Sequence, residues 1–148
     1  MAFLNSLDIA GSGLTATRLR MDVISENIAN ASTTRTEKGG PYRRQAVVYQ
    51  SVKNQSFQQL LNHNVNNTSN PSKGGVKVQK IVEDQSDFTP VYNPSHPDAD
   101  ENGYVMMPNV DPIQEMIDMM AATRAYDLNL SAVNAIKSMA TKALEIGR

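Results

Sequence analysis

The residues best placed to do chemistry form an acidic turn, DADENG, at positions 98–103. Its D-x-D-x-N-G order matches the start of a calcium loop, in which carboxylate and amide oxygens coordinate the ion. Such a loop needs a bidentate glutamate at its twelfth position, which here is Asn109. Pro94, Pro97 and Pro108 also exclude the flanking helices. We therefore interpret the segment as a turn reversed by Asn-Gly, and we expect no metal site.

Residues that could catalyse a reaction are not grouped in a recognisable pattern. The only histidines, His63 and His96, have no cysteine, second histidine or nucleophile–base pair near them in the sequence. No G-x-S-x-G, phosphate-loop or dinucleotide fingerprint is present. Glu26 and Glu115 could supply the acid of a lytic enzyme, but the first suits a helix face and the second favours a helix dipole. We therefore expect no enzyme, no cofactor and no small-molecule substrate.

Charge and composition exclude further classes of protein. The 14 basic and 15 acidic residues give a net charge of -1, whereas a nucleic-acid binder normally carries a basic excess. No apolar run approaches the roughly 18 residues of a membrane span, so we expect no membrane insertion. Cysteine is absent, which excludes disulfides and thiolate metal sites. The N-terminal residues lack a cationic region and Asp8 interrupts them, so we expect no cleaved secretory signal.

Two small clusters of charge lie in the middle of the chain. The favoured interpretation is that both belong to solvated loop and strand faces. The alternative, charge complementarity between neighbouring subunits, stays open. The basic cluster is Arg35, Lys38, Arg43 and Arg44, and the acidic cluster is Glu83, Asp84 and Asp87.

The N-terminal segment carries apolar or small residues at the heptad spacing of a coiled-coil seam. Gly11 and Gly13 each weaken a helix by about 1 kcal/mol relative to alanine. The spacing therefore predicts a helix over about 15–30, preceded by a segment that orders only when packed. The two columns of the seam are Leu7, Leu14, Met21 and Ile28, and Phe3, Ala10, Thr17, Ile24 and Ala31.

The C-terminal segment predicts one long helix from Pro112 to Ile146. Asp111 is a good N-cap, Pro112 suits the first turn, and Gln114 completes a pattern like a capping box. Two apolar stripes on this helix need several neighbours to cover them, which indicates a subunit of a polymer or bundle. One stripe joins the columns Met119, Tyr126, Val133, Ala140 and Ala122, Asn129, Ile136, Ala143; the second is Ile117, Ala121, Leu128, Ala132, Ala135, Met139.

The middle of the chain favours β-structure. Residues 42–52 are rich in β-branched and aromatic side chains, and 76–82 alternate after a Gly-Gly pair. Between them, 53–73 form an Asn/Ser-rich loop, while 84–109 predict extended chain and turns with a short strand at 104–108. We therefore predict an α+β fold in which paired, coiled-coil-like terminal helices flank a small β-rich insert. Its parts are an N-terminal helix (1–34), the insert (35–110) and a C-terminal helix (111–148), the two helices forming an inner, axial domain.

Three blocks of the sequence resemble the flagellar rod and hook protein family. Residues 12–36 are similar to its N-terminal motif, and 39–50 to the strand entry that follows. Residues 109–139 look like its C-terminal helix, including an A-x-R-A-Y-x-x-N pattern. The short middle, 74–110, is similar to that of proximal rod proteins. The matching motif positions are Asn27, Ile28, Ala29, Asn30 and Thr33, and then Ala122, Arg124, Ala125, Tyr126 and Asn129.

The resemblance implies a structural subunit of the proximal rod of the bacterial flagellar basal body. Such a subunit assembles with itself and with other rod proteins into a helical axial tube that transmits torque and passes exported subunits. The resemblance implies synthesis in the cytoplasm, passage through the flagellar type III export apparatus without signal cleavage, and a place on the periplasmic side of the inner membrane.

The stripes and the motif together give the expected assembly interface. A helical adaptor or export chaperone is the alternative function, and it would form a monomer or closed oligomer, whereas a rod subunit needs non-closing contacts. The interface residues are Leu7, Leu14, Met21, Ile24, Asn27, Ile28, Asn30, Ile117, Arg124, Tyr126, Leu128, Asn129, Val133, Ile136 and Met139.

Overall fold

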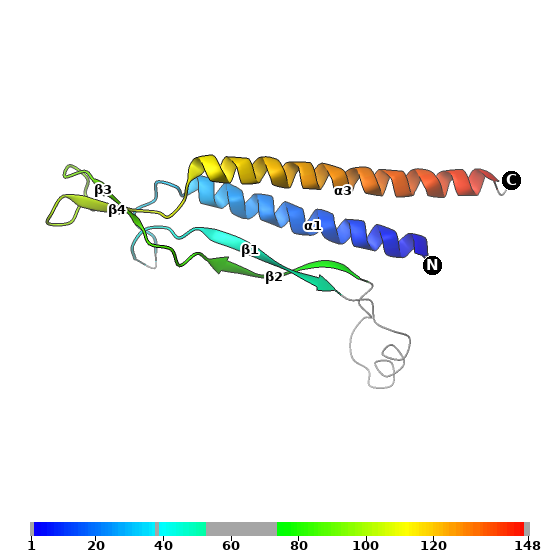
Figure 1. The fold of residues 1–148 in the computed structure, drawn as a ribbon, viewed down its shortest axis with the longest axis horizontal. Helices are drawn as coiled ribbons and strands as arrows, with labels where there is room; N and C mark the ends of the chain where they lie inside the picture. Colours follow the sequence, from blue (N-terminus) through cyan, green and yellow to red (C-terminus); the bar gives the residue numbers. More distant parts are fainter. Residues whose placement is uncertain (1, 38, 53–73, 147–148) are drawn as a thin grey trace, which may run out of the picture. The chain divides into compact units, whose positions relative to one another are not determined.

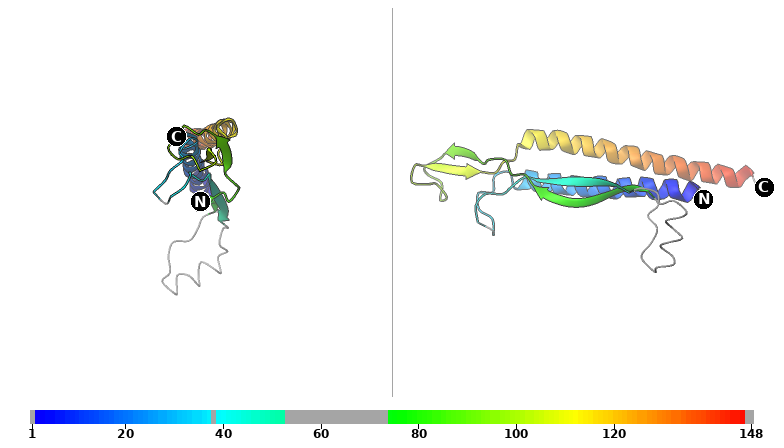
Figure 2. Two further views of the ribbon diagram at one scale, coloured as in Figure 1. Left: turned by 90° about the vertical axis from the view of Figure 1, so that its left-hand side faces the viewer. Right: turned by 60° about the horizontal axis from the view of Figure 1, so that its bottom comes forward.

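The computed structural model describes residues 2–37, 39–52 and 74–146, so the predicted Asn/Ser-rich loop lies outside the described residues. The elements follow the order α1 (Ala2–Ala29), β1 (Gln45–Val52), β2 (Gly75–Glu83), β3 (Thr89–Tyr92), β4 (Tyr104–Met107) and α3 (Pro112–Ile146) (Figure 1). The strands form two separate two-stranded antiparallel sheets, β1 with β2 and β3 with β4 (Figure 2). The predicted α+β class is confirmed.

The chain is organised as two compact units. Unit 1 contains the described parts of Met1–Arg18, Tyr49–Gln79 and Thr123–Arg148, and unit 2 contains those of Leu19–Val48 and Lys80–Ala122. Both units combine residues from the N-terminal and C-terminal halves of the chain. Few large side chains are buried: among the described residues the buried apolar ones are Ala10, Ala16, Val23, Ile24, Val105 and Ala122. None of the described helices is long and apolar enough to span a membrane.

Helix α1 starts much earlier than the sequence predicted. It begins at Ala2 and runs without a break through Gly11 and Gly13. The reason lies at Gly13, where a Cβ would come within 2.9 Å of Asn129 Oδ1 from α3. Asn129 Nδ2 donates to the Ala125 carbonyl at 2.9 Å, which holds that side chain in place. Glycine at position 13 therefore permits a close approach that offsets its poor helix propensity.

A pair of glycine substitutions tests this explanation. Gly11→Ala should raise the free energy of unfolding by about 0.5–1 kcal/mol, because alanine is the better helix former and nothing lies within 4 Å of its Cβ. Gly13→Ala should give no gain or a loss, because its Cβ would clash with Asn129. Urea titration followed by circular dichroism measures both. Equal stabilisation by the two substitutions would contradict the close approach at Gly13.

The β1–β2 sheet matches the two predicted strands to within three residues at either end. Strand β2 begins at a glycine for a clear reason. Gly75 has a φ of 113°, and a Cβ there would collide with Ser12 Oγ. The same hydroxyl accepts a hydrogen bond from Val76 N at 3.1 Å and donates one to the Ile9 carbonyl at 2.7 Å. Ser12 thus ties the start of β2 to α1 within unit 1.

The β3–β4 sheet contains one strand that the sequence did not predict. Strand β4 confirms the expected short strand, whereas β3 was expected only as extended chain. The two strands pair antiparallel, with Tyr92 opposite Tyr104 and Pro90 opposite Met106. A proline is tolerated in β3 because both strands of a two-stranded sheet are edges.

Helix α3 confirms the predicted span and its N-cap. Asp111 Oδ1 accepts hydrogen bonds from Ile113 N at 2.9 Å and Gln114 N at 3.4 Å, which satisfies two of the free N–H groups of the first turn. The helix then continues for 35 residues. The cap fixes where the helix begins and therefore which residues of its first turn face the rest of unit 2.

Candidate assembly site

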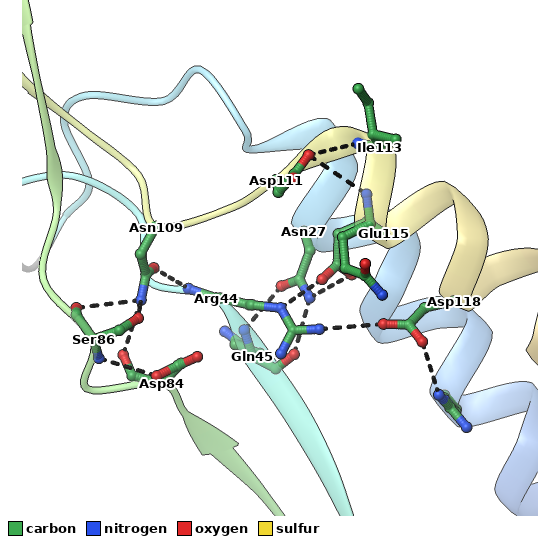
Figure 3. A network of polar contacts seen from close by, with 12 residues as sticks. Asn27, Arg44, Gln45, Asp84, Ser86, Asn109, Asp111, Ile113, Glu115 and Asp118 are labelled. Atoms are coloured by element: carbon green, nitrogen blue, oxygen red, sulfur yellow. Dashed lines mark hydrogen bonds and ion pairs between the residues drawn. The ribbon is translucent and has the colours of Figure 1, made fainter.

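The most buried side chain of unit 2 is a carboxylate in the first turn of α3. Glu115 is 0% exposed. Its Oε1 accepts a hydrogen bond from Arg44 Nε at 2.5 Å, and its Oε2 accepts one from Asn27 Nδ2 at 3.0 Å (Figure 3). The sequence had suggested only a favourable interaction with the helix dipole. That explanation is insufficient, because the buried charge is paired and hydrogen-bonded, as burial requires.

Asn27 uses the full hydrogen-bonding capacity of its amide. Besides Glu115, Nδ2 donates to the Gln45 carbonyl at 2.9 Å. Oδ1 accepts from Gln45 N at 2.9 Å and from the Tyr42 hydroxyl at 3.0 Å. Two donated and two accepted bonds complete the inventory of an asparagine side chain. An aspartate could not donate, so the chemistry specifies asparagine here, within the N-terminal motif singled out from the sequence.

Arg44 extends the network to a second carboxylate. Its Nη2 lies 3.4 Å from Asp118 Oδ2, and Arg20 Nη2 lies 3.3 Å from Asp118 Oδ1. Figure 3 shows Asn27, Arg44, Glu115 and Asp118 converging between α1, the start of β1 and α3. We call Arg20, Asn27, Arg44, Glu115 and Asp118 the polar clasp. It joins the end of α1 to the first turns of α3 within unit 2.

The prediction that the basic cluster is a solvated face is wrong for Arg43 and Arg44. Arg44 is engaged in the polar clasp, and Arg43 stacks its guanidinium 4.3 Å from the centre of the Phe88 ring. Arg43 Nη1 also donates to the Asp84 carbonyl at 3.2 Å. The charges that the sequence places in a loop are covered because distant segments pack against them, so complementarity to another subunit is not needed to explain these two.

Asn109 connects the backbone of Arg44, a member of the polar clasp, to Ser86. Asn109 Oδ1 accepts from Arg44 N at 2.8 Å, and its Nδ2 donates to Ser86 Oγ at 2.8 Å. Hydrogen bonds from Ser86 lower the pKa of the Asp84 carboxyl; the larger effect comes from the backbone N–H of Ser86 and the smaller from its side chain. The position that ruled out a calcium loop therefore has a structural role. Among the described residues, no group of acidic or histidine side chains is placed to hold a metal ion.

The hydroxyl of Tyr42 is held protonated beside the clasp. Burial, followed by the negative charges of Glu26, Glu115 and Glu83, raises the pKa of Tyr42 above its ordinary value. A tyrosine with a raised folded pKa adds stability that is complete below the unfolded pKa of about 10 and is lost as the pH rises through the folded value.

Alkaline pH should therefore weaken the wild-type chain more than Tyr42→Phe. The phenylalanine variant loses a hydrogen bond at every pH, but it has no hydroxyl to ionise. Urea midpoints measured from about pH 9 to about pH 11 should converge between the two proteins, because only the wild type loses the tyrosine contribution. Parallel curves over this range would show that Tyr42 does not titrate with a raised pKa.

The two predicted stripes of α3 differ in how far the rest of the chain covers them. The columns containing Tyr126, Val133 and Ile136 are buried or half-buried for most of their length, whereas every member of the second stripe is exposed in the single chain. In that stripe Ile117 is 49% exposed, Leu128 72% and Met139 62%. Large apolar side chains exposed in a row mark an association surface.

The other expected interface residues divide in the same way. Asn30 caps the end of α1, because its Nδ2 donates to the Glu26 carbonyl at 2.9 Å and its Oδ1 accepts from Thr33. Ile24 and Asn27 are buried and Arg124 is exposed. The half-buried residues are Leu7, Leu14, Met21, Ile28, Asn30, Tyr126, Asn129, Val133 and Ile136.

Sequence reasoning missed four members of the polar clasp. Glu115 and Arg44 were noticed but explained separately, and Arg20 and Asp118 were not noticed. A usable signal was Asn27, a polar residue between apolar heptad positions that required buried partners. The reasoning also missed an exposed apolar cluster at the start of α3, formed by Ile113, Met116, Ile117 and Met120.

Comparison with known proteins assigns both ends of the chain to one group. A family described as "Flagella basal body rod protein" matches residues 7–35, which lie mostly in α1. A second family, described as "Flagellar basal body rod FlgEFG protein C-terminal", matches residues 101–146, which cover β4 and α3. These matches contain Asn27 and Glu115, the central residues of the polar clasp.

Full-length relatives agree with these matches. The flagellar basal-body rod protein FlgC of Bacillus subtilis is 49% identical, with 100% of both chains covered. FlgC of Borreliella burgdorferi is 43% identical over 99% of this chain and 98% of the relative. FlgC of Escherichia coli O6:H1 is 42% identical over the full length of both. The chain therefore belongs to the FlgC family of flagellar basal-body rod proteins, and it is a structural subunit of the rod rather than an enzyme.

Proposed function

We propose that this rod subunit assembles with itself and with other rod proteins into a helical axial tube, chiefly through the exposed stripe of α3. The stripe of Ile117, Leu128 and Met139 is the observation that supports this most directly, because it is apolar and uncovered in the single chain. The tube would transmit torque and pass exported subunits. Non-closing contacts of this kind generate helical assemblies.

In the same proposal α1 and α3 pair like a coiled coil to form the inner, axial domain. The predicted division into residues 1–34, 35–110 and 111–148 describes this arrangement. Support comes from contacts inside each unit: Gly13 meets Asn129 in unit 1, and Asn27 meets Glu115 in unit 2. We further propose that the chain reaches the periplasmic part of the rod through the flagellar type III export apparatus. The resemblance of the terminal motifs to exported rod and hook proteins supports this route.

Substituting Leu128 tests the assembly proposal. Leu128→Asp should leave the isolated chain folded, because the side chain is 72% exposed. Burying its carboxylate against a neighbouring subunit would cost several kcal/mol, which should prevent rod assembly. Flagellated cells with Leu128→Asp as their only copy should make the protein but fail to swim, and electron microscopy should find no complete basal bodies.

Asn134→Asp is the matched control for Leu128→Asp. It adds the same charge at another exposed position of α3, about a third of a turn around the helix. Cells with this variant should swim. Normal swimming with Leu128→Asp would show that the stripe is not an assembly surface, and a monomeric or closed-oligomeric adaptor would then explain the chain better.

A further inference from the structure

The β3–β4 sheet presents an uncovered aromatic surface. Because opposed residues of an antiparallel pair share a face, Tyr92, Tyr104, Pro90 and Met106 lie on one face of the sheet and Val105 on the other. Val105 is buried, while Tyr92 is 65% exposed and Tyr104 45%. The two tyrosine rings meet edge to face, with centroids 5.3 Å apart. We call Pro90, Tyr92, Tyr104 and Met106 the tyrosine platform.

A second uncovered surface in unit 2 has complementary chemistry. Ile113, Met116, Ile117 and Met120 are all exposed at the start of α3, and we call them the methionine patch. Methionine side chains adapt their shape and make favourable contacts between sulfur and aromatic rings. Exposed tyrosines supply the rigid aromatic area that dominates many interfaces.

Charges beside the two surfaces are also complementary. Asp100 and Glu101 belong to the acidic turn that leads into Tyr104, and among the described residues neither carboxylate has a partner. Arg124 continues the row of Ile113, Ile117 and Met120 along α3, and its guanidinium likewise has no partner in the described part of the chain. A platform seated on a patch would bring these opposite charges together at its rim.

We propose that the tyrosine platform of one copy docks on the methionine patch of a second copy of this chain. The inference rests on the assembly function proposed above and names a contact that shares only Ile117 with the Leu128 stripe. Since the platform and the patch are different surfaces, the contact is head-to-tail: each docked copy still offers one free platform or one free patch. Two tyrosines and a few aliphatic side chains bury less than the roughly 1,200 Å² of a stable complex. The contact is therefore weak between isolated pairs of chains and persists when assembly holds the copies together.

Cysteine cross-linking tests the contact directly, because the natural chain contains no cysteine. Cells should co-express Tyr104→Cys and Met116→Cys chains, and their purified rods should be treated with a short bismaleimide. The proposal expects a cross-linked dimer when both variants are present and none with either variant alone. Met106→Cys should replace Tyr104→Cys with the same outcome. Replacing Met116→Cys by Asn134→Cys, about five turns further along α3, should reduce the yield of cross-linked dimer to about a tenth or less.

Three results would overturn the proposal. Dimers from a single variant would show a self-complementary contact, an equal yield with Asn134→Cys would show non-specific collision, and no dimer with either platform cysteine would show that the surfaces do not meet. A charge exchange gives an independent measurement. Glu101→Arg or Arg124→Glu in the cysteine variants should each lower the yield about tenfold, and combining the two should restore it. Swimming by Leu128→Asp cells would refute the proposal that the stripe is an assembly surface. The cross-linking result tests the contact between platform and patch independently of that outcome.

Discussion

Replacing Glu115 by alanine should lower the free energy of unfolding by about 3–5 kcal/mol, the usual cost of removing one partner from a buried ion pair. The guanidinium of Arg44 and the amide of Asn27 would lose a partner inside unit 2, where water does not reach Glu115. Urea unfolding followed by circular dichroism measures the change. A loss of this size is a large part of a small protein's stability.

Controls separate the buried pair from an effect of charge alone. Glu101→Ala removes an exposed carboxylate of the acidic turn and should change stability by less than about 0.5 kcal/mol. The double variant Glu115→Met, Arg44→Met should recover much of the loss, because apolar residues of similar size can replace a buried ion pair. If Glu115→Ala and Glu101→Ala cost the same, the polar clasp would contribute nothing to stability.

A charge in the half-buried stripe of α3 should abolish swimming and loosen unit 1. Val133→Asp and Ile136→Asp place a carboxylate where the single chain already covers most of the side chain. Desolvating that unpaired charge costs several kcal/mol. Unlike Leu128→Asp, these variants should therefore show faster amide hydrogen exchange in the isolated protein, in residues 123–146 of α3, as well as failing to build rods.

Lys137→Asp is the control for these two variants. Lys137 is exposed, so the substitution changes charge without burying it, and cells carrying it should swim. Unit 2 offers an internal reference, since exchange at Ala122 and in β4 should stay close to wild type in all three variants. Swimming by both Val133→Asp and Ile136→Asp cells would show that the stripe containing these residues tolerates charge and is not part of a packed seam.

Local signals in the sequence predicted most of the elements. Asp111 and Pro112 fixed the start of α3 because capping is a property of neighbouring residues. The alternation after Gly75 similarly predicted β2. The early start of α1 could not be predicted in this way, because the close approach of Asn129 to Gly13 joins residues that are distant in the sequence.

The candidate site was predicted less completely than the fold. The sequence identified both apolar stripes of α3 but could not tell which one the chain itself covers, since Val133 and Leu128 have similar hydrophobicity. Exposure decides this, and it depends on packing against other segments. The polar clasp was missed for the same reason: nothing near Glu115 in the sequence indicates that Asn27 and Arg44 will surround it.

The separation of the clasp's partners has a consequence for how the protein is made. Glu115 lies 71 residues after Arg44 and 88 residues after Asn27. A chain still on the ribosome that ends before Glu115 therefore contains both of its partners without the carboxylate that they surround. Closing so long a loop also costs conformational entropy before any contact repays it. Unit 2 can reach its native structure only after most of the polypeptide, through Glu115, has been synthesised. This unit therefore remains without its native packing for most of translation.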